Sequence, residues 1–197
     1  MTKQINTREI ALDILIRILE YQEYSHIVLR QALSKYQYLD KTDRAFITRL
    51  VEGTLEYLIQ IDYVIDRFSK VKVKKMKPVI RSLLRMSVYQ ILYLDRVPDS
   101  AACDEAVKLA VKRKFQGLKG FVNGVLRTVS RQKQTLAWPS DSVRYSMPEW
   151  IVELLNSSYG PETAKAVMES FLKPAKLAVR CNLDRAALCS FMVTEPV

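Results

Sequence analysis

The chain has 197 residues, of which 49% are apolar and 5 are glycine. So few glycines argue against an all-β fold and against a nucleotide-binding α/β unit, because both depend on glycine-rich turns or loops. The formal net charge is +10, and its distribution is uneven: residues 1–140 hold 25 Lys and Arg against 14 Asp and Glu, whereas residues 141–197 hold 6 against 7. This asymmetry is typical of a polyanion-binding module joined to a neutral segment, although a solubilising surface charge explains it equally well.

The sequence also contains no sign of a membrane span, a secretion signal or a metal site. No apolar run approaches the roughly 18 residues of a transmembrane helix, and the N-terminal apolar stretch is interrupted by charges. The cysteines Cys103, Cys181 and Cys189 are odd in number and widely spaced. We therefore expect a cytoplasmic protein with reduced thiols, without a bound metal and without a membrane partner.

Helical periodicity dominates the first third of the chain. An amphipathic helix is expected over residues 6–22, where Asn6 and Glu9 have the spacing of a capping box. A shorter helix follows from about residue 25, and a third helix opens at Thr42. The apolar stripe then continues to residue 68, either directly or after a break near residue 60.

Five lysines lie in the segment 70–77, which interrupts this pattern. Pro78 fits the first turn of the next helix, where its missing N–H has no consequence. Two more helices are expected over about 100–114 and 118–129. The first of these has small inward-facing residues, which indicate close helix packing. The lysine segment itself is more simply explained as a solvated loop than as a ligand contact.

The last quarter of the chain predicts a small appendage. Ser146 and Glu149 have capping-box spacing before an apolar helix, Gly160 is placed as its C-cap, and Pro161 begins another helix. Leu177, Val179 and Cys181 alternate along one face and predict the one convincing strand, which a short helix follows. We therefore expect an all-α bundle of about six to seven helices, followed by a small helix–helix–strand appendage.

One stretch of sequence is specific enough to indicate a family. Residues 87–127 read SVYQILYLDRVPDSAACDEAVKLAVKRKFQGLKGFVNGVLR. This stretch resembles the second half of the NusB-type helical domain, and the helices expected over 6–68 match the first half in order and length. The most specific part is FVNGVLR after DEAVKLA. The resemblance implies a NusB-like RNA-binding domain over residues 1–135, a linker over 136–145 and a linking subdomain over 146–197.

Two features indicate one branch of that family. Arg127 stands where free-standing NusB antitermination factors usually have an acidic residue, and the chain continues through MPEWIVELLNSSYG and LAVRCN. Both continuations resemble the RsmB/Sun (Fmu) family of 16S ribosomal RNA cytosine-5 methyltransferases. In that family a NusB-like domain and a small linking domain precede the catalytic domain. The chain therefore resembles the N-terminal region of such an enzyme.

The resemblance also implies that this chain has no catalytic residue. The family's S-adenosylmethionine loop has no counterpart here, and none of the three cysteines has the Pro-Cys or Thr-Cys context of the family's catalytic thiols. We expect a non-enzymatic chain without a cofactor, S-adenosylmethionine being expected only for the catalytic domain. Its partners would be ribosomal RNA and that domain. The alternatives are a transcription antitermination factor that acts with a ribosomal protein, and a protein-interaction bundle.

In the resembled antitermination factors, RNA lies over the N-terminal helix and near the FVNGVL helix. Carried onto this chain, the candidate RNA-binding residues are Lys3, Arg8, Lys112, Arg113, Lys114, Lys119 and Arg127. A solvated helix end, whose cations suit the helix dipole, is the alternative for residues 112–114. Tyr57, Tyr89 and Tyr93 have the rings to stack on bases, but their places in apolar stripes favour core packing.

The same helix contains the structural motif Phe121, Asn123 and Gly124. A glycine inside a helix destabilises it by about 1 kcal/mol relative to alanine, so its presence calls for a reason. We expect Gly124 to admit a second helix at close range and Asn123 to fix that crossing by a hydrogen bond to a neighbouring backbone group. Contact of Asn123 with an RNA base is the alternative.

Overall fold

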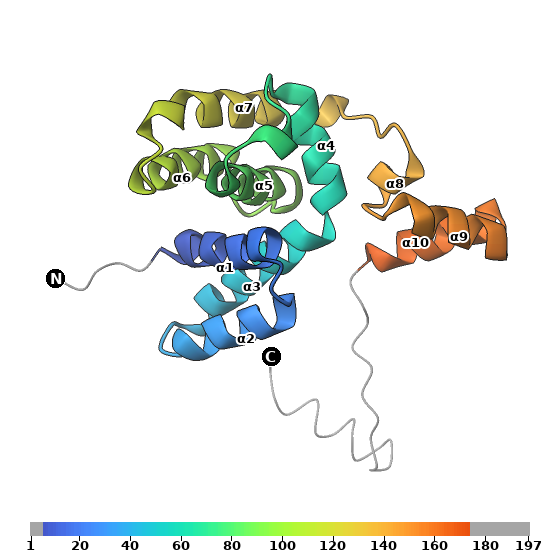
Figure 1. Ribbon diagram of the computed structural model, residues 1–197, viewed down its shortest axis with the longest axis horizontal. Helices are drawn as coiled ribbons and strands as arrows, with labels where there is room; N and C mark the ends of the chain where they lie inside the picture. Colours follow the sequence, from blue (N-terminus) through green and yellow to red (C-terminus); the bar gives the residue numbers. More distant parts are fainter. Residues whose placement is uncertain (1–5, 174–197) are drawn as a thin grey trace, which may run out of the picture.

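Ten α-helices make up the described part of the chain, residues 6–173 of a computed structural model (Figure 1). The first seven form one bundle: α1 (Thr7–Tyr21), α2 (Ser25–Lys35), α3 (Lys41–Glu56), α4 (Leu58–Phe68), α5 (Pro78–Tyr93), α6 (Asp99–Lys112) and α7 (Lys119–Gln132). The other three form the appendage: α8 (Asp141–Arg144), α9 (Glu149–Tyr159) and α10 (Pro161–Phe171). The all-α prediction is confirmed, while the strand expected at 177–181 and the helix after it lie outside the described residues.

Local sequence explains where these helices begin. Asn6 caps α1 as expected, because its Oδ1 accepts hydrogen bonds from the backbone N–H groups of Arg8 (3.0 Å) and Glu9 (3.2 Å). Asp40 caps α3 in the same way, so that helix starts one residue before the predicted Thr42. The break between α3 and α4 falls at residue 57, and the next helix begins with its proline at the first position, as predicted.

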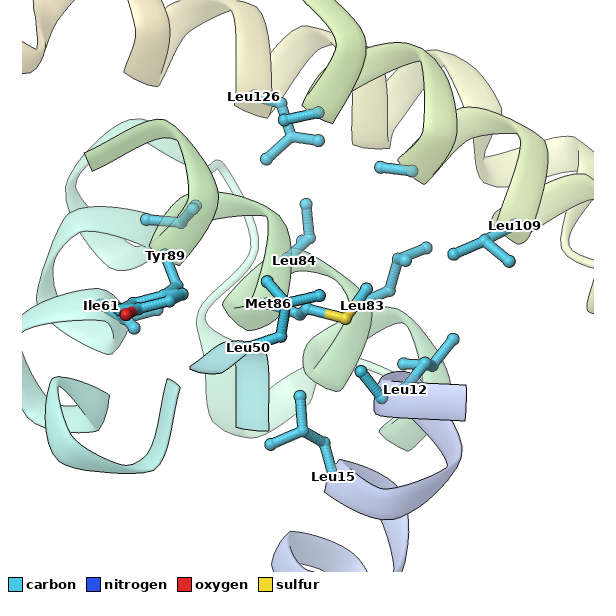
Figure 2. Close-up of a cluster of buried hydrophobic side chains, with 14 of the residues drawn as sticks. Leu12, Leu15, Leu50, Ile61, Leu83, Leu84, Met86, Tyr89, Leu109 and Leu126 are labelled. Atoms are coloured by element: carbon cyan, nitrogen blue, oxygen red, sulfur yellow. The ribbon is translucent and has the colours of Figure 1, made fainter. Parts of the chain in front are cut away.

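The centre of the bundle is α5, which packs against α1, α3, α4, α6 and α7. Figure 2 shows side chains from these helices converging on it, including Leu83, Leu84 and Met86 of α5 itself. Because α5 is enclosed, its polar residues Ser82, Ser87 and Gln90 are buried too, and the last two donate hydrogen bonds to their own helix. The Ser87 hydroxyl donates to the carbonyl of Leu83 at 2.8 Å, for example. A helix that is apolar nearly all round is the expected consequence of such a position.

Ion pairs tie α5 to its neighbours. Arg85 donates two 2.7 Å hydrogen bonds, from Nε and Nη2, to the carboxylate of Asp62 in α4. Arg81 pairs with Glu20 at the end of α1. The hydrogen bonds with Glu20 raise the pKa of Arg81 above its ordinary value, against the opposing effect of burial. The two arginines therefore orient α5 with respect to α1 and α4.

The close helix crossing expected at Gly124 is wrong. Gly124 lies on the exposed side of α7, and no neighbouring atom of residues 6–173 comes within 4 Å of the position that a Cβ would take. The buried stripe of α7 consists of Val122, Val125, Leu126 and Val129, and Gly124 points away from it. The close approach occurs elsewhere: a Cβ on the buried Gly53 of α3 would overlap the ring and hydroxyl of Tyr89.

The segment between α7 and α8 lies against the bundle. Leu136 and Trp138 pack on the main core, and the Tyr63 hydroxyl donates to the carbonyl of Ala137 at 3.2 Å. Gln60 of α4 is buried and donates through Nε2 to the carbonyl of Arg144 in α8. The expected linker is thus held in place along α4, although the division into domains stays a prediction.

The appendage is a helical hairpin with a small core of its own, made by Tyr145, Val152, Ala164 and Met168. The capping role predicted for Ser146 is wrong. Helix α9 begins after Pro148 without a side-chain cap, and the Ser146 hydroxyl instead accepts the backbone N–H of Ile59 at 3.2 Å.

Gly160 terminates α9 as predicted, with a φ of 75° that favours glycine, and α10 follows directly. Within residues 6–173, no helix combines the length and the apolar character needed to cross a membrane.

Candidate nucleic-acid interface

Arg8 is the first of the predicted cations that the structure describes, since Lys3 lies outside the described residues. Its Nε donates to Gln90 Oε1 at 2.7 Å, and its guanidinium lies over the ring of Phe46, 5.1 Å from the centroid. Burial lowers the pKa of Arg8, while the nearby Glu105 carboxylate opposes that effect. Arg8 therefore links α1 to α3 and α5, and its charge faces the protein.

Lys112 and Arg113 are likewise occupied by contacts with α1. Lys112 Nζ pairs with Glu9, and Arg113 Nη2 lies 2.6 Å from Asp13 Oδ1 and 3.4 Å from Glu9 Oε1. The hydrogen bond with Asp13 raises the pKa of Arg113. These two cations attach the end of α6 to α1, and the carboxylates offset much of the charge that they would offer to a polyanion.

Lys114 and Lys119 are exposed, as Lys112 is, but neither of them forms an ion pair within residues 6–173. Lys114 has a φ of 65°, which turns the chain sharply after α6. The next residue, Phe115, packs on the core, and Lys77 Nζ lies 5.8 Å from the centroid of its ring. The turn after α6 therefore meets the lysine-rich segment that precedes α5.

That segment is more than a solvated loop. Residues Val73–Lys75 form a 3₁₀ turn, η1, and both Val73 and Met76 are buried in the core. The backbone N–H of Val73 donates to Asp66 Oδ1 at 2.7 Å. Lys74 and Lys75 are exposed between these two anchors. The apolar pair at positions 73 and 76, set among lysines, is the signal in the sequence that could have indicated this anchoring.

The two segments together contribute five exposed lysines to one set, and Lys77 joins the segments through its contact with Phe115. We call this set the lysine surface: Lys74, Lys75, Lys77, Lys114 and Lys119. None of these side chains forms an ion pair with a carboxylate in the described part of the chain. Two of the five, Lys114 and Lys119, are predicted RNA-binding residues, and the lysine segment supplies the other three.

The tyrosines that could stack on bases belong to the core, as the apolar pattern favoured. Tyr57 and Tyr93 stack on each other with centroids 4.1 Å apart, and Tyr89 is fully buried beside them. The Tyr93 hydroxyl donates to Gln60 Oε1, and burial raises the pKa of that phenol.

The remaining motif residues lie on α7. Phe121 packs against the core. The hydrogen bond expected from Asn123 to a neighbouring helix is not found among residues 6–173, and its Oδ1 instead accepts a 3.0 Å hydrogen bond from Arg127 Nε. Arg127 is exposed. Asn123 therefore orients the Arg127 side chain.

The described residues contain no cluster of side chains suited to a metal ion. Cys103 is buried, and burial raises the pKa of its thiol, against the opposing effect of Arg127. A thiol in that state is a poor nucleophile at neutral pH. The feature of residues 6–173 that suits a ligand is the lysine surface, a basic surface on a helical scaffold.

Comparisons with known proteins identify the family to which this helical bundle belongs. The NusB family matches residues 5–131, so the chain belongs to the NusB family. It is also similar to the probable ribosomal RNA small subunit methyltransferase B of Bacillus subtilis (strain 168), with 37% identity over 204 residues, which cover 99% of this chain and 45% of that protein. The chain thus spans less than half the length of that relative, and the predicted resemblance to its N-terminal region is confirmed.

Solved structures share the fold. NusB of T. maritima is 25% identical, has a TM-score of 0.59 and covers 64% of this chain, which covers 89% of it. A second match is a complex of the antitermination factors NusB and NusE with double-stranded RNA, where the identity is 21%, the TM-score is 0.59, and the coverage is 64% of this chain and 93% of that one.

Proposed function

We propose that this chain is the RNA-binding, non-catalytic N-terminal part of an S-adenosylmethionine-dependent ribosomal RNA (cytosine-C5) methyltransferase. It holds ribosomal RNA in position for the methyltransferase domain. The observation that carries the proposal is the lysine surface, which offers five exposed cations without carboxylate partners in the described chain. The similarity to a ribosomal RNA methyltransferase of Bacillus subtilis supports the substrate class, and the complex of a NusB with RNA supports the nucleic acid partner.

The physical basis is attraction between lysine ammonium groups and the phosphates of RNA. Each phosphate contact releases a condensed counterion, so binding weakens as the salt concentration rises. The anchors Val73 and Met76 fix the backbone that carries Lys74 and Lys75, which limits the backbone entropy lost on binding. Lysine is a point charge without a fixed hydrogen-bonding fork, so this surface supplies affinity and orientation more than base selectivity.

An antitermination factor that works with a ribosomal protein is the second candidate, since a NusB–NusE complex has the same bundle. The extent of the similarity favours the methyltransferase. The Bacillus relative matches 99% of this chain, which includes the appendage, whereas NusB of T. maritima matches 64%.

The lysine surface can be tested by substitution. The quadruple variant Lys74→Ala, Lys75→Ala, Lys114→Ala and Lys119→Ala should bind a 16S ribosomal RNA hairpin more weakly. The log–log salt dependence should flatten by about 0.7 to 0.9 for each phosphate that a substituted lysine had neutralised. Fluorescence anisotropy at several salt concentrations measures both quantities.

The matched control removes four other exposed lysines: Lys35, Lys41, Lys165 and Lys173. Equal losses in both variants would mean general charge attraction without a defined surface. A quadruple variant that binds like the wild-type chain would place the RNA elsewhere, while a wild-type chain without salt-dependent RNA binding would remove the proposed function altogether.

The non-catalytic role has its own test. We expect calorimetry to detect no binding of S-adenosylmethionine to this chain, and we expect no methyl transfer to ribosomal RNA, because the sequence has neither a cofactor loop nor a Pro-Cys thiol. Binding in the micromolar range would contradict this expectation.

A further inference from the structure

A pocket of about 310 Å³ lies between the start of α6 and the second half of α7. It is lined by Asp99, Ser100, Cys103, Arg127, Ser130 and Arg131. These residues belong to neither segment of the lysine surface. Within the pocket lining, the two arginines are separated by one helical turn and supply two guanidinium groups.

Both guanidinium groups are oriented by the helix that carries them. Arg127 Nε donates to Asn123 Oδ1 at 3.0 Å, and Arg131 Nε donates to the carbonyl of Arg127 at 3.3 Å. Neither arginine forms an ion pair with a carboxylate of residues 6–173. Like charges four residues apart destabilise a helix, so an anion between them would relieve a standing repulsion.

The one carboxylate in the lining is already matched. Asp99 Oδ2 accepts a 2.7 Å hydrogen bond from the Ser130 hydroxyl and lies 2.9 Å from Lys133 Nζ, and its Oδ1 lies 3.0 Å from the same ammonium group. The negative charge of Asp99 is thereby directed at Lys133. The positive charges of Arg127 and Arg131 are therefore not neutralised by Asp99.

The exposed side of α7 beside the pocket is open. Gly120 and Gly124 lie one turn apart, and no atom in the described part of the chain comes within 4 Å of the Cβ position of either. A partner can therefore approach the α7 backbone more closely here than at any residue with a side chain. The close approach of a partner would explain why a glycine occupies position 124 inside the helix, although no helix of the described chain packs against it.

We infer that this pocket binds a phosphate group of the RNA backbone. The fork of an arginine matches the oxygens of a phosphate and binds them through two hydrogen bonds, and Asn123 holds one fork in position. The Ser100 side chain at the lining adds a hydroxyl donor. This site rests on the proposed function, since it adds a defined phosphate contact to the general attraction of the lysine surface.

The experiment compares two double variants in the 197-residue chain. Arg127→Ala with Arg131→Ala should weaken binding of the 16S ribosomal RNA hairpin by roughly ten- to a hundredfold, the usual range for lost hydrogen bonds to charged groups. It should also flatten the log–log salt dependence by about 0.7 to 0.9, the value for one phosphate contact. Arg127→Lys with Arg131→Lys should weaken binding while the salt dependence stays unchanged, because lysine keeps the charge and loses the fork.

Two further arms distinguish a defined backbone site from general charge attraction. The control pair Arg30→Ala and Arg44→Ala removes two exposed arginines from α2 and α3, at the other end of the bundle from α7 (Figure 1). Hairpins with one neutral methylphosphonate linkage are then scanned. A single linkage should weaken binding to the wild-type chain and have no effect on the Arg127→Ala, Arg131→Ala variant.

Equal behaviour of the pocket variant and the control pair would overturn the inference and leave the lysine surface intact. The inference would also be overturned if the Arg127→Lys, Arg131→Lys variant bound RNA like the wild-type chain, since positive charge alone would then suffice. A methylphosphonate scan in which no single linkage weakens binding to the wild-type chain would overturn it too. Loss of binding only in the quadruple lysine variant would support the proposed function without this site. No RNA binding by the wild-type chain would overturn both.

Discussion

Gly53→Ala should lower the free energy of unfolding by about 1 to 3 kcal/mol, the usual range for overpacking a core. The added methyl group would overlap the ring and hydroxyl of Tyr89, which is fully buried. That ring cannot swing aside freely, because it packs beside Tyr57 and Tyr93. Helix propensity would favour alanine at position 53, so a net loss of stability would report the clash directly.

The same substitution at Gly124 is the matched control, and its expected effect has the opposite sign. Nothing lies within 4 Å of the new Cβ, and α7 is helical there, so Gly124→Ala should stabilise the bundle by up to about 1 kcal/mol. Thermal and denaturant melts of the two variants measure both changes. If both alanines stabilised the protein, the close approach of α3 and α5 would be refuted.

Gly124→Ala also bears on the RNA site. Because we infer that RNA approaches α7 at this point, the stabilised variant should bind the RNA hairpin more weakly than the wild-type chain. The glycine would then be kept for binding at the expense of helix stability.

Gln60→Ala should both destabilise the protein and loosen the contact between α4 and α8. The buried Gln60 side chain donates to the carbonyl of Arg144 and accepts from the Tyr93 hydroxyl. Burial raises the pKa of Tyr93, so the phenol stays protonated and can donate its hydrogen bond at neutral pH. Alanine would leave that donor without its partner, at a cost of about 1 to 3 kcal/mol.

Amide hydrogen exchange would locate the effect. The N–H groups of Tyr145 and Met147, which bond within the α8 turn, should exchange faster in Gln60→Ala than in the wild-type chain. Gln37→Ala, at an exposed glutamine, is the control and should change neither exchange nor the melting temperature. Unchanged protection at α8 would show that the packing of Trp138 and its neighbours is sufficient to hold this segment.

Several features followed from the sequence because their causes are local. The cap at Asn6, the proline that starts α5 and the glycine that ends α9 each act within one helical turn, so a short stretch of residues determines them. The apolar stripe of α7 is equally local. Gly124 falls outside that stripe in the sequence itself. The apolar periodicity therefore already placed Gly124 on the exposed side of the helix, where no second helix can cross.

The partners of charged side chains depended on the tertiary structure. Lys112, Arg113 and Lys114 are consecutive, and nothing in their sequence separates them. Folding brings Glu9 and Asp13 of α1, which are distant along the chain, against the first two, and the third has no ion pair within residues 6–173. Whether a lysine is available to RNA is therefore decided by long-range ion pairs, because electrostatic attraction depends on distance in space.

The amino-acid sequence by itself determined the helical class, most helix boundaries, the family and the positive charge of residues 1–140, because periodicity, capping and composition act locally or as sums over the chain. Only the tertiary structure decided that Gly53 lies against Tyr89, that Val73 and Met76 anchor the lysine segment, and that this segment meets Phe115. Those contacts join residues far apart in the chain, and their geometry exists only once the helices have packed.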